Sequence, residues 1–219
     1  MKFCSPLIAI VLLLGNPRGF SQSFANLDFE SADLSGYPIG SVVPTANAFP
    51  GWTVNAGSIL YDTVTLSGGS ISLMDSNSAT FWEPTTPIQG NYFVLFENVF
   101  ASPSGSEPVS IGQTGMIPRS AKSLTFWGDD EGLQITFNGQ PLAFEAMGAT
   151  ADYSIYGADI SEYAGQTGEL LFTAPPFTGG DALDNIQFSR SEIPEPGEFA
   201  LAVIGGLMLA GQRWRKSSR

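Results

Sequence analysis

Residues 133–144 read LQITFNGQPLAF, and this stretch decides the fold class. Apolar side chains at 133, 135 and 137 alternate with polar ones, which is the period of a strand with one buried face. Asn138-Gly139 follows directly, and both residues tolerate the positive φ that a two-residue hairpin turn requires. We therefore expect a tight hairpin that joins residues 133–137 to residues 142–144.

Similar short runs occur on both sides of this hairpin, with turn residues such as Thr178-Gly179-Gly180 between them. Only residues 160–164 indicate a helical turn. Many short strands without long helices predict an all-β domain of two packed antiparallel sheets, and we expect this β-sandwich to be a jelly roll. The other expected strands span residues 51–54, 58–62, 70–74, 92–97, 109–113, 123–127, 153–160, 169–173 and 183–188.

Residues 1–23 have the character of a secretory signal peptide. Lys2 supplies the positive start, residues 7–14 form an uncharged apolar stretch, and small residues follow. Cleavage after Ser21 and cleavage after Ser23 fit equally well. The apolar stretch is far shorter than the roughly 20 residues that a bilayer requires. We therefore expect an exported protein whose main domain covers residues 24–190.

The exported part has no thiol chemistry and is strongly acidic. The only cysteine, Cys4, lies within the expected signal peptide, so no disulfide or thiolate metal site is expected. Residues 24–193 hold nineteen acids against three bases, Arg119, Lys122 and Arg190, a net charge of −16. Such a surface excludes nucleic acid as a partner, because phosphate contacts need Lys and Arg. The acidity fits either solubility outside the cell or the binding of divalent cations.

Residues 191–219 form a separate C-terminal segment. Its apolar stretch, 199–211, would span about 20 Å as a helix, against about 30 Å for the hydrocarbon core of a bilayer. The basic end, 212–219, favours the cytoplasmic side of the inner membrane. We expect a segment held briefly in the membrane and then cut. The basic residues are Arg213, Arg215, Lys216 and Arg219.

The tripeptide Pro194-Glu195-Pro196, followed by this apolar stretch and basic end, resembles the PEP-CTERM sorting signal. The resemblance covers about the last 26 residues. It implies recognition by an exosortase, a membrane transpeptidase of Gram-negative bacteria that make exopolysaccharide. An ordinary C-terminal membrane anchor is the alternative. The resemblance therefore implies delivery to the cell surface or extracellular matrix.

The ends of the central domain resemble galactose-binding-like jelly rolls, a fold shared by many carbohydrate-binding modules. Asn26-Leu27-Asp28-Phe29-Glu30, with Pro50-Gly51-Trp52, is similar to the opening of that fold. The segment 183–188, with its early Asp184, is similar to its closing strand. The resemblance implies a structural Ca²⁺ held between the first and last strands by Glu30 and Asp184, with Asp28 beside them. Surface acids next to turns are the alternative interpretation. We expect the opening segment to be extended, so that Asp28 and Glu30 share one face while Leu27 and Phe29 enter the core.

The composition excludes most enzyme mechanisms. The chain contains no histidine, which rules out Ser-His-Asp catalysis and His-ligated zinc or iron. A carboxylate pair, as in glycoside hydrolysis, is the catalytic chemistry that remains. The densest acids, Asp129-Asp130-Glu131, follow an expected strand and precede Gly132, which is typical of a solvated turn. We therefore expect no enzyme activity.

Exposed indole rings are the best sequence candidates for contact with glycans, because the C–H faces of sugars stack on them. Trp52 and Trp127 lie in or beside expected strands, so we expect both in the core. Trp82 is next to a Pro-rich loop and is the candidate for glycan contact. The leading interpretation is a non-catalytic surface or matrix protein associated with exopolysaccharide. The alternatives are a glycan-binding module proper and a carboxylate-dependent enzyme that acts on polysaccharide.

Overall fold

The computed structural model describes residues 22–65, 69–75, 89–98, 107–128, 132–150, 153–178 and 180–193. Three expectations fall outside these residues: the signal peptide up to residue 21, the acids at 129–131, and Trp82. The complete sorting signal from Pro194 onwards, with its apolar stretch and basic end, also lies outside them. No helix in the described part of the chain is long and apolar enough to cross a membrane.

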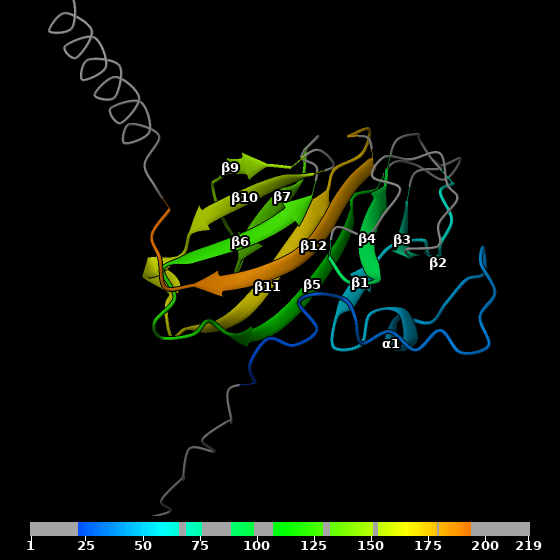
Figure 1. Cartoon of the computed structure of the whole chain (residues 1–219), viewed down its shortest axis with the longest axis horizontal. Helices are drawn as coiled ribbons and strands as arrows, with labels where there is room; N and C mark the ends of the chain where they lie inside the picture. Colours follow the sequence, from blue (N-terminus) through cyan, green and yellow to red (C-terminus); the bar gives the residue numbers. More distant parts are fainter. Residues whose placement is uncertain are drawn as a thin grey trace, which may run out of the picture.

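The described residues form two β-sheets that pack face to face around one core (Figure 1). The strands are β1 (Thr53–Asn55), β2 (Ser58–Tyr61), β3 (Ser70–Asp75), β4 (Tyr92–Glu97), β5 (Val109–Met116), β6 (Ser123–Gly128), β7 (Gln134–Phe137), β8 (Gln140–Pro141), β9 (Phe144–Ala149), β10 (Ser154–Asp159), β11 (Thr167–Ala174) and β12 (Gly180–Ser189). Two short helices accompany them, α1 (Thr45–Ala48) and the 3₁₀ turn η1 (Ser161–Tyr163). The five-stranded sheet has the order β1-β5-β11-β7-β8, and the seven-stranded sheet has the order β2-β3-β4-β12-β6-β10-β9. The predicted all-β sandwich is confirmed.

One strand pair departs from the antiparallel pattern that the sequence predicts. Among the described strand pairs, β2 and β3 alone run parallel, with Ser58 opposite Ser70 and Tyr61 opposite Leu73. The strand β2 is only four residues long, so a short connection suffices to bring the chain back to its starting level. Asp62 begins this return at a positive φ of 45°. The sandwich is therefore mixed at this edge.

The predicted Asn138-Gly139 turn is confirmed. Both residues have positive φ, 50° and 74°, and Phe137 pairs with Gln140 across the turn. The returning strand β8 is shorter than expected, although the Leu142 N–H still donates to the Ile135 carbonyl at 2.9 Å. The chain then crosses to the seven-stranded sheet, where β9 begins at Phe144, whose ring packs edge-on against Phe126 in the core. The expected pairing of 142–144 with 133–137 is therefore confirmed only at Leu142.

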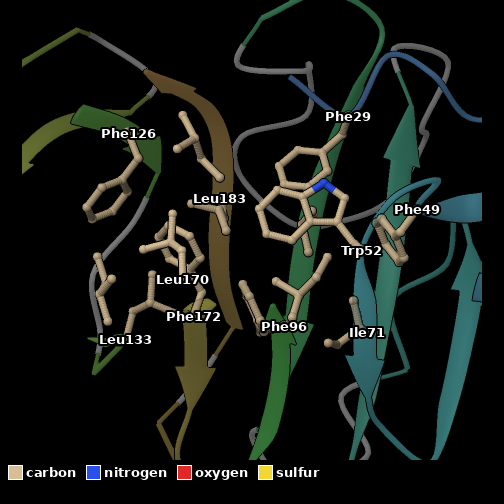
Figure 2. Close-up of a cluster of buried hydrophobic side chains, with 14 of the residues drawn as sticks. Phe29, Phe49, Trp52, Ile71, Phe96, Phe126, Leu133, Leu170, Phe172 and Leu183 are labelled. Carbon is tan, nitrogen blue, oxygen red and sulfur yellow. The ribbon is translucent and has the colours of Figure 1, made fainter. Parts of the chain in front are cut away.

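The core draws large aromatic side chains from both sheets (Figure 2). Phe126 of one sheet meets Phe172 of the other at a centroid distance of 5.9 Å. Trp52 is buried as predicted, lies 5.4 Å from Phe29, and donates its indole N–H to the Asn26 carbonyl. Burial of each such ring contributes about 2–3 kcal/mol, so packing alone supplies a large stabilisation in a domain without disulfides.

Both ends of the described chain are attached to the sandwich. The Met116 N–H donates to the Gln22 carbonyl, and Phe24 packs 5.2 Å from Phe188. At the other end, the Ser123 hydroxyl donates to the Ser191 carbonyl. The folded unit thus extends slightly beyond the expected limits of 24–190 on both sides.

Candidate functional site

The three acids that the jelly-roll resemblance implicates lie near one another, beside the loop that leads into β4. The Asp184 carboxylate accepts a hydrogen bond from the Gln89 N–H at 2.7 Å. The Glu30 carboxylate accepts bonds from the N–H groups of Asn91 and Tyr92 at 2.6 and 2.9 Å, and from the Asn91 side-chain amide at 2.8 Å. Two carboxylates that are 154 positions apart in sequence therefore hold one loop.

Close packing at this loop requires glycine at position 90. Gly90 has a φ of +68°, and a Cβ on it would collide with the Glu30 carboxylate. A residue without a side chain lets Glu30 reach two successive backbone N–H groups. The Gly that precedes the expected strand at 92–97 thus has a specific structural role.

Asp184 is an acid in an unfavourable environment for its charge. It is fully buried, and this burial, with smaller contributions from the charges of Glu30 and Asp28, raises its pKa to about 8. Hydrogen bonds from the backbone N–H groups of Asn185 and Gln89 act in the opposite direction and lower the pKa. The site thus groups acids whose charges oppose one another, and the one ion pair of the described residues, Lys122–Glu192, lies elsewhere.

The oxygen atoms at this site are suitable ligands for a hard cation, but their arrangement does not form a complete metal site. Carboxylate oxygens are the ligands that Ca²⁺ prefers, and the buried Gln89 side-chain oxygen has no hydrogen-bond partner in the structure. However, no group of three or more His, Cys, Asp or Glu residues in the described part of the chain is placed to hold one metal ion. Calcium binding by Asp28, Glu30 and Asp184 therefore stays a prediction.

The opening segment that carries two of these acids is a turn, and the expected extended conformation is wrong. Asn26 and Phe29 have positive φ values of 50° and 57°. Phe29 is still fully buried, because the turn directs its ring against Phe49 and Trp52. Asp28 accepts a bond from the Glu30 N–H at 3.4 Å, which is a local contact within the turn.

Trp127 lies on the outer face of the seven-stranded sheet, where it packs half-buried against a second, smaller hydrophobic core, and it takes no part in the main core between the sheets. Leu124 and Phe126 of β6 are buried between the sheets, so Thr125 and Trp127 project from the opposite face. The half-buried indole stacks on Tyr153, with centroids 4.9 Å apart and planes inclined by 16°. This aromatic pair packs beside a small buried cluster of Met74, Phe93, Leu95 and Ala182.

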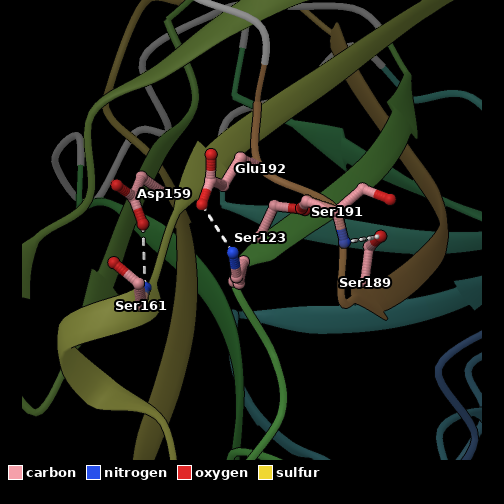
Figure 3. Close-up of polar contacts among 7 residues, drawn as sticks. Ser123, Asp159, Ser161, Ser189, Ser191 and Glu192 are labelled. Carbon is pink, nitrogen blue, oxygen red and sulfur yellow. Dashed lines mark hydrogen bonds and ion pairs between the residues drawn. The ribbon is translucent and has the colours of Figure 1, made fainter.

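A groove lies farther along the same outer face, over β9 and β10. Figure 3 shows two of its acidic residues, Asp159 and Glu192, with their polar contacts. It has a volume of about 400 Å³ and adjoins a second hollow of about 390 Å³, with which it shares Ala143 and Asp159. Its lining combines Gly157, which the Met147 and Ile193 side chains cover, with apolar and acidic residues. The apolar residues are Ala143, Phe144 and Ile193, and the acidic ones are Glu145, Asp159 and Glu192.

Charge in the groove is held in fixed positions. Lys122 and Glu192 form an ion pair with an N–O distance of 2.5 Å. The Ser161 N–H donates to Asp159 at 2.8 Å, and this bond, with a second from the Ser161 hydroxyl, lowers the pKa of Asp159. Because Asp159 stays ionised and Glu145 and Glu162 add further carboxylates, the groove is negative at neutral pH.

Sequence reasoning missed both outer-face features. The alternation in Ser123–Gly128 places Trp127 on the same face as the polar Thr125, and this signal would have moved the indole out of the main core. The groove had no comparable signal, because β9 is rich in Ala and Gly and shows no alternation. Trp82, the expected glycan contact, lies outside the described residues.

No protein-family model and no curated protein matches this chain. Among solved structures it is similar to a cyclase from Fischerella sp. in its apo form, with 15% identity, a TM-score of 0.41, and coverage of 76% of this chain and 93% of that chain. The enzymatically active domain of Bacteriophage CBA120 tailspike protein 4 gives 14% identity and a TM-score of 0.39, over 77% of this chain and 21% of that chain. Similarity at this level carries no argument about function.

Proposed function

We propose that this chain is a non-catalytic surface or extracellular-matrix protein of a Gram-negative bacterium that associates with exopolysaccharide. In this proposal the signal peptide directs export and an exosortase processes the chain at Pro194-Glu195-Pro196, after a transient stay of residues 199–211 in the inner membrane. The domain between them is a jelly roll that contacts the glycan directly.

The observation that carries the proposal is the stacked pair of Trp127 and Tyr153 on the outer face. Sugar rings present C–H faces that pack on aromatic rings, and aromatic side chains offer a large contact area at little entropic cost. The pair lies on the same sheet face as an open groove lined by both apolar and polar groups, as ligand sites commonly are. Both features point to a binding surface.

The acidic residues give less support to the alternative that the protein is an enzyme acting on polysaccharide. Asp184 has the raised pKa that a general acid needs, but it is fully buried and bonded to backbone N–H groups, so it does not reach a substrate. The acids of the groove include Asp159, whose pKa is lowered. Incubation with polysaccharide should release no new reducing ends, and their release would favour the enzyme.

Retention on polysaccharide tests the proposal. The secreted protein should be retained on exopolysaccharide from its host, and Tyr153→Ala should weaken binding about tenfold by removing the stack. Tyr37→Ala is the matched control, because Tyr37 is also half-buried but packs against the main core, so its retention should equal that of the unmodified protein. Failure of the unmodified protein to bind any host polysaccharide would contradict the proposal.

A further inference from the structure

We propose that the groove over β9 and β10 binds glycans that carry free amines and excludes anionic glycans. This inference rests on the proposed function and specifies the class of its ligand. It concerns the part of the outer face next to the Trp127–Tyr153 pair.

The aromatic pair and the groove belong to one continuous surface. On β10, Ile155 lies opposite Trp127, and Gly157 lies opposite Thr125 of β6. Asp159 follows on the same face, because alternate residues of a strand share a face. Four residues of strand place Asp159 about 13 Å from Ile155, a length that a short oligosaccharide can span.

Two apolar side chains lie over β10 beside the groove. At position 157 a Cβ would collide with the Met147 sulfur and lie 2.6 Å from the Ile193 Cδ1, so only glycine lets these side chains pack over the strand. Met147 is exposed and Ile193 lines the groove, so together they offer an apolar surface on which the C–H face of a sugar can lie. A larger residue at position 157 would displace both side chains and disrupt this surface.

The charge of the groove selects the ligand. Glu145, Asp159, Glu162 and Glu192 provide four carboxylates in the two adjoining hollows, and Lys122 pairs with one of them, Glu192. An anionic glycan would be repelled, because the residues that line the two hollows include four acids and no Lys or Arg. An ammonium group on the sugar would gain charge-assisted hydrogen bonds.

Glu145 is the residue best placed to accept such a bond. It is half-buried between apolar neighbours, and within the described part of the chain no hydrogen bond or ion pair engages its carboxylate. A carboxylate in these surroundings gains more from an ammonium partner than one in open solvent does. We therefore expect Glu145 to contribute most to the preference for amines.

The test compares three oligosaccharides at about pH 6, where glucosamine amines are charged and surface carboxylates are ionised. Glucosamine oligomers should bind the full secreted protein, their N-acetylated counterparts should bind about tenfold more weakly, and uronic-acid oligomers should not bind. Glu145→Gln should remove the preference for the amine while leaving the melting temperature unchanged. Glu169→Gln, an exposed acid on the opposite sheet, should preserve it.

The outcomes separate this inference from the proposed function. If Tyr153-dependent binding occurs but does not distinguish amine from N-acetyl, the inference is wrong and the proposed function stands. If Glu145→Gln and Glu169→Gln lose the preference for the amine equally, the ligand is attracted by the overall charge of the protein, which also overturns the inference. Competition by a lysine-rich peptide without any glycan binding would identify the occupant as a cationic protein, and both proposals would fall.

Discussion

Asp184 is the residue whose chemistry is most at odds with its surroundings. Its folded-state pKa is raised to about 8 by burial and by the neighbouring acids, above that of an exposed aspartate in the unfolded chain. Between these two values the folded protein holds a proton that the unfolded chain has lost. Stability therefore falls as pH rises through this range.

Substitution at this position tests the assignment. In EDTA, the free energy of unfolding should decrease from about pH 5 to pH 9, and Asp184→Asn should flatten that decrease because it removes the titrating group. Asp33→Asn is the matched control, since Asp33 is an exposed acid whose pKa is lowered, so it should leave the slope over this range intact. An unchanged slope in Asp184→Asn would contradict the assignment.

Added Ca²⁺ provides a second arm of the same measurement. If Asp184, Glu30 and Asp28 share an ion, calcium should raise the melting temperature, and the effect should be largest at high pH, where Asp184 is ionised. Both EDTA and Ca²⁺ should then change the melting temperature of Asp184→Asn less than that of the unmodified protein. A melting temperature indifferent to both reagents would remove the calcium prediction.

Among the elements, β5 anchors the start of the chain through one side chain. Gln113 is buried, accepts a bond from the Ala25 N–H at 2.7 Å, and donates to the carbonyls of Ala25 and Gly51 at 3.0 and 2.9 Å. A single amide thus joins the entering segment and the turn before β1 to the strand β5.

Gln113→Leu should lower the free energy of unfolding by about 1–2 kcal/mol, because three polar backbone groups lose their partner. It should also speed hydrogen exchange at the Ala25 amide. Gln134→Leu, on an exposed position of β7, should cost less than about 0.5 kcal/mol. Equal destabilisation by the two variants in urea titrations would contradict this role of Gln113.

Strands with clear alternation could be predicted from the sequence, whereas elements shaped by distant contacts could not. Tyr92–Glu97 is found where expected, and the turn at 160–164 appears as η1. The strand β9 escaped prediction because its Ala- and Gly-rich edge packs few side chains. The turn at Phe29 also escaped, since a positive φ at a bulky residue arises only from tertiary packing.

The same division applies to the candidate site. The grouping of Glu30 with Asp184 was expected from the family resemblance. In the structure both carboxylates accept hydrogen bonds from the same loop, from the N–H groups of Asn91 and Gln89. The groove was not predictable, because its walls come from β9, from β10 and from the segment after β12, and no local pattern links them.

At the level of the whole molecule, the protein is a packed, acidic β-sandwich, and we propose that two terminal signals deliver it. The sandwich follows from the described residues, while export and sorting rest on the sequence at the two ends. The central claim therefore concerns what happens to those ends in the cell.

Intact-mass spectrometry of the protein recovered from the exopolysaccharide fraction of its host tests this claim most directly. The account predicts a chain that begins after Ser21 or Ser23 and lacks the apolar stretch 199–211 and the basic residues beyond it. Pro194→Ala combined with Pro196→Ala should leave the tail in place and the protein in the membrane. A mature protein that retains Arg213 to Arg219, or one found only inside the cell, would contradict the account.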